Sequence, residues 1–219
     1  MTPTRALLLA ALLAGCARAP VAPPPAGDNA AAWYRDAAAA GAKVLAIDPA
    51  QSLIAVTVRR GGPLARLGHD HVVASRGITG FVAPAAGRAD FSVRLDQMSV
   101  DEPALRKEAG LDTTPSAAAI EGTRANMLAR VLDAERFPVV ALHAEQLKDQ
   151  GVRLTVTLHG VTRTVDAAAV GVEHGAGTVT ASGTLQLRQS DFGITPMSVM
   201  AGAMTVQDTM ELRYRIVAR

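Results

Sequence analysis

Alternation of apolar and polar residues with a period of two is the feature that most limits the folds open to this chain. From 52 to 60, for example, Ile54, Val56 and Val58 share one parity. The same alternation recurs at 90–96, 152–159, 178–188 and 210–216. Side chains of a strand point alternately to its two faces, so each segment is predicted to be a strand with one apolar face and one wet face. Weaker candidates at 43–48, 78–83, 139–145 and 161–170 bring the expected number to about eight or nine.

One segment departs from this alternation. A helix start is expected at Pro115-Ser116, and apolar residues follow at helical spacing, among them Ile120, Met127 and Val131. We expect one main helix from about Ser116 to Leu132, with its apolar stripe buried. A many-stranded antiparallel sheet with one helical excursion closes most simply into a barrel, because closure leaves no unpaired edge. The predicted fold class is therefore mainly β, an antiparallel barrel of about eight strands.

The residues predicted to point inward suggest that the barrel interior holds a ligand. An eight-stranded barrel is just wide enough inside for side chains or for one small ligand. The inward residues are mainly aliphatic, and aromatic residues make up only 3% of the chain, so the bulk that usually plugs a small barrel is missing. The alternative is that these side chains pack together as a β-sandwich or a closed core. The predicted lumen residues are Ile54, Val56, Val58, Phe81, Phe91, Val93, Leu95, Leu142, Leu154, Val156, Leu158, Leu185 and Leu187, with Met127 and Leu128 as a cap.

Residues 1–15 are predicted to be a lipoprotein signal peptide. They combine Arg5 with an apolar run of about ten residues, which is too short to span a bilayer. Leu13-Ala14-Gly15-Cys16 resembles the bacterial lipobox, in which the signal is cut before a cysteine that then carries the lipids. Cys16 is the only cysteine, so a disulfide within the chain is excluded and a lipidation point is expected. The alternative is an ordinary signal peptide with an incidental cysteine.

Residues 16–42 are predicted to be a tether between the lipidated cysteine and the folded domain. The segment is Pro-rich and then Ala-rich, and only Trp33-Tyr34-Arg35-Asp36 within the alanines suggests a short helix. Ala17 follows the cysteine, and the lack of aspartate there favours the outer membrane in the lipoprotein-sorting pattern. We therefore expect a lipid-anchored protein of the bacterial cell envelope that faces the periplasm, with residues 43–219 as one domain.

Charge and motifs exclude several classes of function. A net charge of +2 with scattered basic residues does not indicate a basic surface that could bind nucleic acid. Ser190-Asp191 could join the histidines in a triad only on paper, because the chain has no Gly-x-Ser-x-Gly, no Gly-rich phosphate loop and no clustered carboxylate pair. We therefore expect neither enzymatic activity nor a cofactor.

His69 and His71 are the strongest candidates for a polar site. Residues at i and i+2 of a strand point the same way, so the two imidazoles could face one ion. A metal site needs three or four ligands, and the parity or loop position of His143, His159 and His174 places these histidines elsewhere. We therefore predict no metal, and expect His69 and His71 to be structural or to contact a ligand head group at the mouth of the lumen.

Five segments, in order, match the pattern of a known family. They are VLAIDPAQSLIAVTV, RLGHDHVVASRGITGFV, NMLARVLDAERFPVVALHA, LTVTLHGVTRTV and LRQSDFGI. From about Val44 to Arg219 the chain thus resembles the YceI-like family of polyisoprenoid-binding proteins of bacterial periplasms. The resemblance implies a lipocalin-like barrel whose lumen holds a long isoprenoid chain. Residues 95–101 and Arg124-Ala125-Asn126 depart from the family pattern, which leaves the identity of the ligand open.

The function expected from this resemblance is non-catalytic binding, for storage or transport, of a long-chain isoprenoid, a quinone-like lipid or a similar amphiphile. Burial contributes roughly 0.8 kcal/mol per CH₂, so even a few isoprene units offset the freedom they lose. Two other hypotheses stay open: a metal- or haem-handling envelope lipoprotein that uses His69 and His71, and a structural envelope module. The oligomeric state is open too, with a homodimer as one option.

Overall fold

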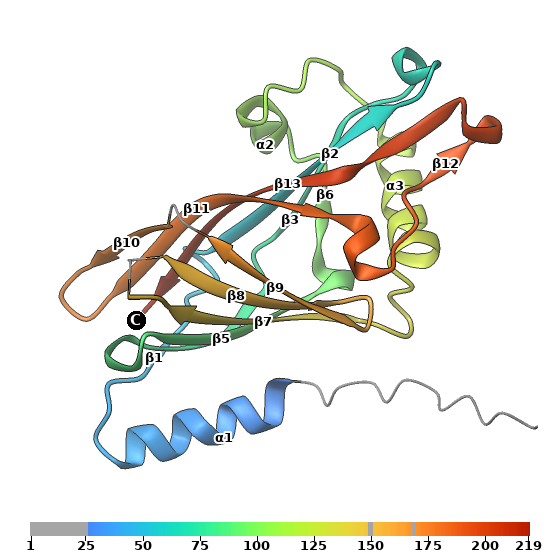
Figure 1. The fold of residues 1–219 in the computed structure, drawn as a ribbon. Coiled ribbons are helices and arrows are strands. Elements are labelled where there is room, and N and C mark those ends of the chain that lie inside the picture. The colour runs from blue at the N-terminus through green and yellow to red at the C-terminus, as the bar shows by residue number, and fades with distance from the viewer. Residues whose placement is uncertain (1–25, 149–150, 168–169) are drawn as a thin grey trace, which may run out of the picture.

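Two antiparallel sheets face each other in the folded domain (Figure 1). The computed structural model describes residues 26–148, 151–167 and 170–219. The predicted signal peptide and Cys16 lie outside the described residues. The strands are β1 (Leu45–Ala46), β2 (Leu53–Gly61), β3 (His71–Ser75), β4 (Ile78–Ala83), β5 (Arg88–Arg94), β6 (Ser99–Val100), β7 (Val139–Gln146), β8 (Val152–Leu158), β9 (Val161–Ala167), β10 (Val170–His174), β11 (Val179–Arg188), β12 (Ser198–Val199) and β13 (Met204–Ala218).

The order of the strands confirms a mainly β, antiparallel fold, but the prediction of one closed barrel of about eight strands is wrong. Thirteen strands among the described residues form a six-stranded sheet, β1-β4-β5-β7-β8-β9, and a seven-stranded sheet, β10-β11-β13-β2-β3-β6, with β12 beside β13. The sheets meet where β1 runs beside the end of β13: the Asp48 N–H donates to the Val217 carbonyl (2.8 Å). The seven-stranded sheet ends in β6, which has two residues. The chain then continues into α2 and α3, so β6 is too short to pair with another strand and close a barrel.

Helices cover the strands from outside and at the open end. They are α1 (Ala26–Ala39), α2 (Pro103–Glu108) and α3 (Ala117–Asn126), which continues into the π-helical turn η4 (Met127–Val131). The predicted helix from about Ser116 to Leu132 is thus confirmed, and its first turn is capped by the Ser116 hydroxyl, which accepts the Ala119 N–H (3.2 Å). The remaining turns are short 3₁₀ segments: η1 (Ala65–Leu67), η2 (Pro84–Ala86), η3 (Leu95–Gln97), η5 (Gln189–Phe192) and η6 (Met200–Gly202). None of the helices in the described ranges combines the length and apolarity needed to cross a bilayer.

Helix α1 packs against the outer face of the six-stranded sheet, a contact that the sequence did not predict (Figure 1). Its Tyr34 is only 2% exposed, and the Tyr34 hydroxyl donates to Asp90 Oδ2 (2.9 Å), which also accepts Arg88 Nε (2.7 Å). Burial and the hydrogen bond to the Asp90 carboxylate raise the pKa of Tyr34. The Arg88 guanidinium lies 4.4 Å from the centre of the Trp33 ring. Residues 26–39, predicted as part of a tether, are therefore a helix of the folded domain.

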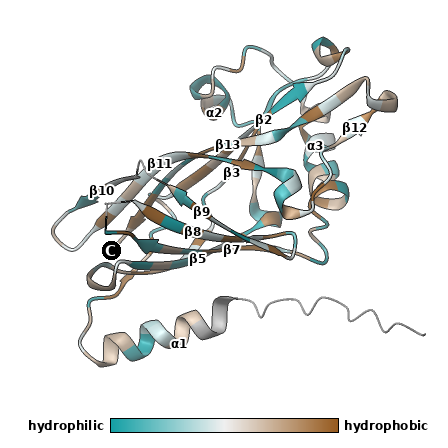
Figure 2. Ribbon diagram, in the orientation of Figure 1, coloured by the Kyte–Doolittle hydropathy of each residue, from teal (hydrophilic) through white to brown (hydrophobic). Residues whose placement is uncertain are grey.

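Two buried clusters hold the sheets together. The first cluster fills the end where the sheets meet and contains Leu45, Ile47, Ile78, Val93, Val179, Ile216 and Ala218. The second contains Val156, Leu158, Leu187, Phe192 and Ile194. Figure 2 shows hydrophobic residues along strands of both sheets and on the loop that follows β12. The side chains between the sheets do not fill the whole space, and a cavity remains next to α3.

Candidate functional site

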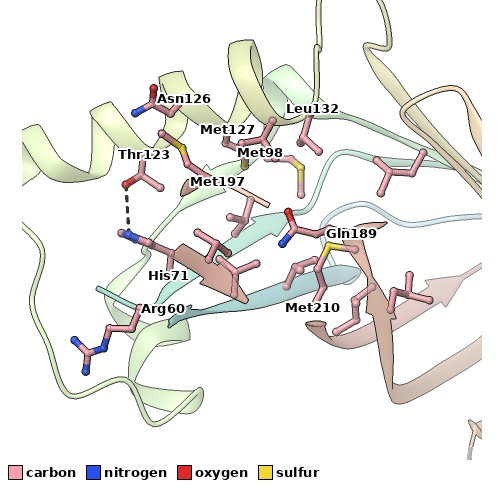
Figure 3. Close-up of a pocket in the computed structure, with 18 of the residues that line it drawn as sticks. Arg60, His71, Met98, Thr123, Asn126, Met127, Leu132, Gln189, Met197 and Met210 are labelled. Atoms are coloured by element: carbon pink, nitrogen blue, oxygen red, sulfur yellow. Dashed lines mark hydrogen bonds between the residues drawn. The ribbon is translucent and has the colours of Figure 1, made fainter. Parts of the chain in front are cut away.

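A cavity of about 460 Å³ lies between the two sheets, under α3 and η4 (Figure 3). Its walls come from β2, β3, β5, β7, β8, β11 and β13, and its open end from α3, η4 and the loops that contain η1 and β12. A volume of this size falls in the range of ~300–1,000 Å³ that is typical of small-ligand sites. The cavity is thus large enough to take a ligand without rearrangement of the sheets.

The cavity wall collects most of the residues that alternation predicted for a lumen. The structure brings together Ile54, Val56, Val58, Val93, Leu95, Met127, Leu142, Leu154, Val156, Leu158 and Leu187. These residues come from strands of both sheets, from η3 and from η4, which are far apart in the sequence. Their side chains are aliphatic apart from Met127, and the wall they form can hold an apolar ligand by burial alone.

Four predicted lumen residues lie elsewhere. Phe81 is 37% exposed on the outer face of β4, where its ring stands 5.4 Å from that of Tyr34 in α1. This assignment is wrong because alternation from the fully buried Ile78 turns Phe81 outward. Phe91 packs on the cluster that fills the closed end of the sheets. Leu185 packs on the second cluster, and Leu128 follows Met127 by one helical position, which turns it away from the cavity wall.

Four methionines are among the lining residues that alternation missed. Met98, Met197, Met204 and Met210 line the cavity together with Met127, and Figure 3 shows several of them at the open end. Met98 and Met197 lie in connections between strands, where a period of two has no meaning, whereas Met210 and Leu212 belong to an alternating strand and were within reach of the same reasoning. Methionine side chains are flexible and polarizable, so this end can adapt to ligands of different shape.

Polar groups gather at the open end of the cavity. Arg60, His71, Thr123 and Asn126 lie at one end of the close-up (Figure 3), and His69 also lines the cavity. His71 Nε2 is 3.5 Å from Thr123 Oγ1, and Arg60 Nη1 donates to the Gly68 carbonyl (2.7 Å). The cavity therefore has an apolar interior and a polar mouth, which is the distribution that an amphiphile needs.

A buried ion network fixes the mouth. The Asp101 carboxylate is fully buried and lies 2.6 Å from His71 Nδ1, and it accepts the Val72 N–H (3.0 Å) and Arg106 Nη1 (2.5 Å). Burial acts to raise the pKa of Asp101, but the hydrogen bonds from His71, Val72 and Arg106 outweigh it and hold the pKa below its usual range. Arg106, from α2, also donates to the Asp70 carbonyl (2.8 Å). The network ties α2 to the start of β3 and so sets the orientation of His71.

His69 is the one imidazole at the mouth with an unused buried atom. Its Nδ1 is buried and has no hydrogen-bond partner among the described residues. The His69 ring lies 6.2 Å from that of His71. A buried polar atom without a partner is costly, and His69 also lines the cavity, so a ring rotation that turned Nδ1 toward a head group would remove this cost.

The other histidines do not join His69 and His71. His143 lies on the outer face, 2.7 Å from Asp90 Oδ1, as its parity predicted. The His159 ring packs 5.0 Å from that of Phe137, and His174 ends β10 rather than lying in a loop. Within residues 26–148, 151–167 and 170–219, no three His, Cys, Asp or Glu side chains form a group able to hold a metal ion.

Antiparallel sheets around an open apolar cavity with polar groups at its mouth define this chain as a β domain whose cavity could admit a ligand. The family model of the YceI-like domain matches residues 45–218. The chain belongs to the YceI-like family, and the resemblance found in its sequence is thereby confirmed. No curated protein sequence matches the chain.

Two solved structures have the same fold. One is a polyisoprenoid binding domain from Saccharophagus degradans implicated in plant cell wall breakdown, with a TM-score of 0.56 and 12% sequence identity, over 80% of this chain and 97% of that one. The other is BcnA of Burkholderia cenocepacia, with a TM-score of 0.54 and 14% identity, over 79% of this chain and 99% of that one. At these identities the comparison establishes the fold.

Proposed function

We propose that this protein binds the apolar chain of a long isoprenoid or of a similar amphiphilic lipid, and stores or carries it without catalysis. The observation that carries the proposal is the cavity, whose interior is built mainly from aliphatic side chains and methionines and whose mouth carries polar groups. The Saccharophagus domain that shares the fold is described as polyisoprenoid binding, which supports the same class of ligand here.

The interior would hold the chain through burial. Each CH₂ removed from water contributes roughly 0.8 kcal/mol, so affinity grows with the length of chain that fits. The flexible methionines tolerate branches, and selectivity among apolar chains is therefore expected to be low. The head group would lie at the mouth, where His69, His71 and Arg60 line the same opening.

Native mass spectrometry of protein purified from cell envelopes tests this proposal directly. We expect the mass of one apolar-chain lipid on each polypeptide, and the same lipid in an organic extract of the sample. Metal analysis of the same preparation tests the alternative of a metal- or haem-handling protein. A preparation that carries a stoichiometric metal and no lipid would refute the proposal.

Replacement of His69 by leucine is expected to change which head groups are bound while the apolar chain is retained. The substitution removes the free Nδ1 but leaves the aliphatic wall and the Asp101 network intact. Lipidomic analysis of the extracted ligand measures the outcome, with His174→Leu as a matched control at the exposed end of β10. If His69→Leu instead removes a bound metal and leaves the lipid profile unchanged, His69 is a metal ligand.

We further propose that Cys16 carries lipids and holds the protein in the outer membrane, facing the periplasm. The support is the Leu13-Ala14-Gly15-Cys16 pattern, followed by Ala17. Replacement of Cys16 by serine is expected to move the protein out of the membrane fraction, because the anchor supplies most of the membrane affinity. Fractionation of cells that express each form measures this, and equal amounts of both forms in the membrane fraction would contradict the lipid anchor.

A further inference from the structure

We propose that the open end of the cavity docks on the surface of a lipid bilayer through two adjacent loop tips. The first tip, residues 61–68, contains η1, and the second, residues 197–204, contains η6. This inference rests on the proposed function, since a bilayer is the source and the destination of a lipid cargo. In Figure 1 the two loops project from the same end of the molecule, beyond β2 and β12.

Exposed apolar side chains concentrate on these tips. Leu67 is 56% exposed, Met200 61% and Val199 38%, and they make up half of the large hydrophobic residues that are exposed in the described parts of the chain. Leu67 and Val199 also line the cavity. At Leu67 and Val199 the apolar surface outside is therefore continuous with the apolar wall inside, so an apolar chain can pass these two residues with little exposure to water, and the polar groups of the mouth remain available to a head group.

Backbone contacts hold the two tips together. The Leu64 N–H donates to the Ala203 carbonyl (2.8 Å), and Gly62 packs so tightly on Ala203 that a Cβ would lie 2.7 Å from its oxygen. Met200 and Ala201 both have a φ of 53°, a left-handed conformation that residues with a side chain rarely adopt. The exposed position of Met200 is thus part of a defined turn rather than a loose end.

The charge of the tips favours a bilayer as the partner. Residues 61–68 and 197–204 contain a single charged side chain, Arg66, which is exposed. An apolar surface beside a basic group suits the interface of a membrane that contains anionic lipids. Cys16, the proposed lipid anchor, precedes α1 by ten residues, which can span at most about 35 Å. A lipid on Cys16 would keep the domain within that reach of the membrane.

Tryptophan fluorescence of the full chain tests this docking. Leu67→Trp places a probe on the first tip. Val172→Trp places one on β10, where Val172 is also an exposed apolar residue, with 39% of its surface exposed. With vesicles of phosphatidylethanolamine and phosphatidylglycerol in equal amounts, we expect the emission of the Leu67→Trp protein to shift to shorter wavelength and that of the Val172→Trp protein to stay unchanged. Trp33, the only native tryptophan, adds the same background to both.

A second probe, Met200→Trp, covers the case in which position 67 alone disturbs its loop. The protein preparations are extracted for bound lipid before vesicles are added. If they contain lipid but the emission of neither tip probe shifts with vesicles, the bilayer surface is the wrong partner and the proposed binding function stands. If both tips shift and no lipid can be extracted, docking is supported and the storage function fails. A shift at Val172→Trp equal to that at the tips would also overturn the proposed orientation.

Discussion

Replacement of Val156 by phenylalanine is expected to shorten or exclude the lipid chain bound in the cavity, with most of the extractable lipid lost. Val156 is 4% exposed, lies on the cavity wall in β8 and pairs with Leu142 of β7. A phenyl ring at this position takes space that the chain would occupy. Overpacking of this kind costs typically about 1–3 kcal/mol, so the fold is expected to survive. Quantitative extraction of lipid from equal amounts of each protein measures the effect.

The matched control for Val156→Phe is Thr155→Phe. Thr155 precedes it on the same strand, and the Thr155 hydroxyl lies 3.1 Å from that of Thr164 on the exposed face. The control introduces the same ring on the opposite side of the sheet and should leave the lipid content unchanged. Equal lipid content in both variants, with both proteins folded, would mean that the chain does not lie in this cavity.

Alternation revealed the strands and their inward faces because it follows from backbone geometry within a strand. Alternation carries no information on which strand lies beside which, so the order of the strands in the sheets could not be predicted. Closure into one barrel depended on the edge beyond β3, where two residues of β6 pair and the chain then turns into α2. A strand that short is not visible as a periodic pattern, so two sheets and a barrel could not be told apart.

The packing of α1 on the sheet could not be predicted from the sequence for a different reason. Alanines predict little beyond a helix, and the docking depends on Tyr34 and Arg88, which meet at Asp90. Tyr34 and Asp90 are 56 positions apart. No local pattern links residues at that separation, and a buried tyrosine within an Ala-rich segment was the only available sign.

The residues of the candidate site were likewise predicted mainly where they lie within strands. Wall residues within strands followed from parity, whereas Met98 and Met197 in connections did not. Parity also predicted that His69 and His71 face the same opening. Both residues line the cavity, although β3 begins at His71 and His69 lies before the strand. The partner that orients His71, Asp101, lies 30 positions away and has a left-handed φ of 57°. Such a network becomes visible only once the helices and sheets are in place.

Replacement of Asp101 by asparagine is expected to produce the largest loss of stability of any single change considered. The side chain of Asp101 is 0% exposed and that of Arg106 is 7% exposed. Loss of one partner leaves the other charge buried, which typically costs about 3–5 kcal/mol. Arg106 keeps its bond to the Asp70 carbonyl, so we expect about 3 kcal/mol. Asparagine tolerates the left-handed backbone, so backbone strain adds little.

Urea unfolding measures the effect of Asp101→Asn, with Asp96→Asn as control, because Asp96 pairs with Arg94 in solvent. Since the pKa of Asp101 is lowered in the folded state, its carboxylate stabilises the protein above the unfolded pKa of about 3.8. This contribution declines as the pH falls through the folded value. The difference between wild type and Asp101→Asn should therefore shrink as the pH falls below about 3.8. A difference no larger than that of Asp96→Asn would show that the network does not hold the mouth in place.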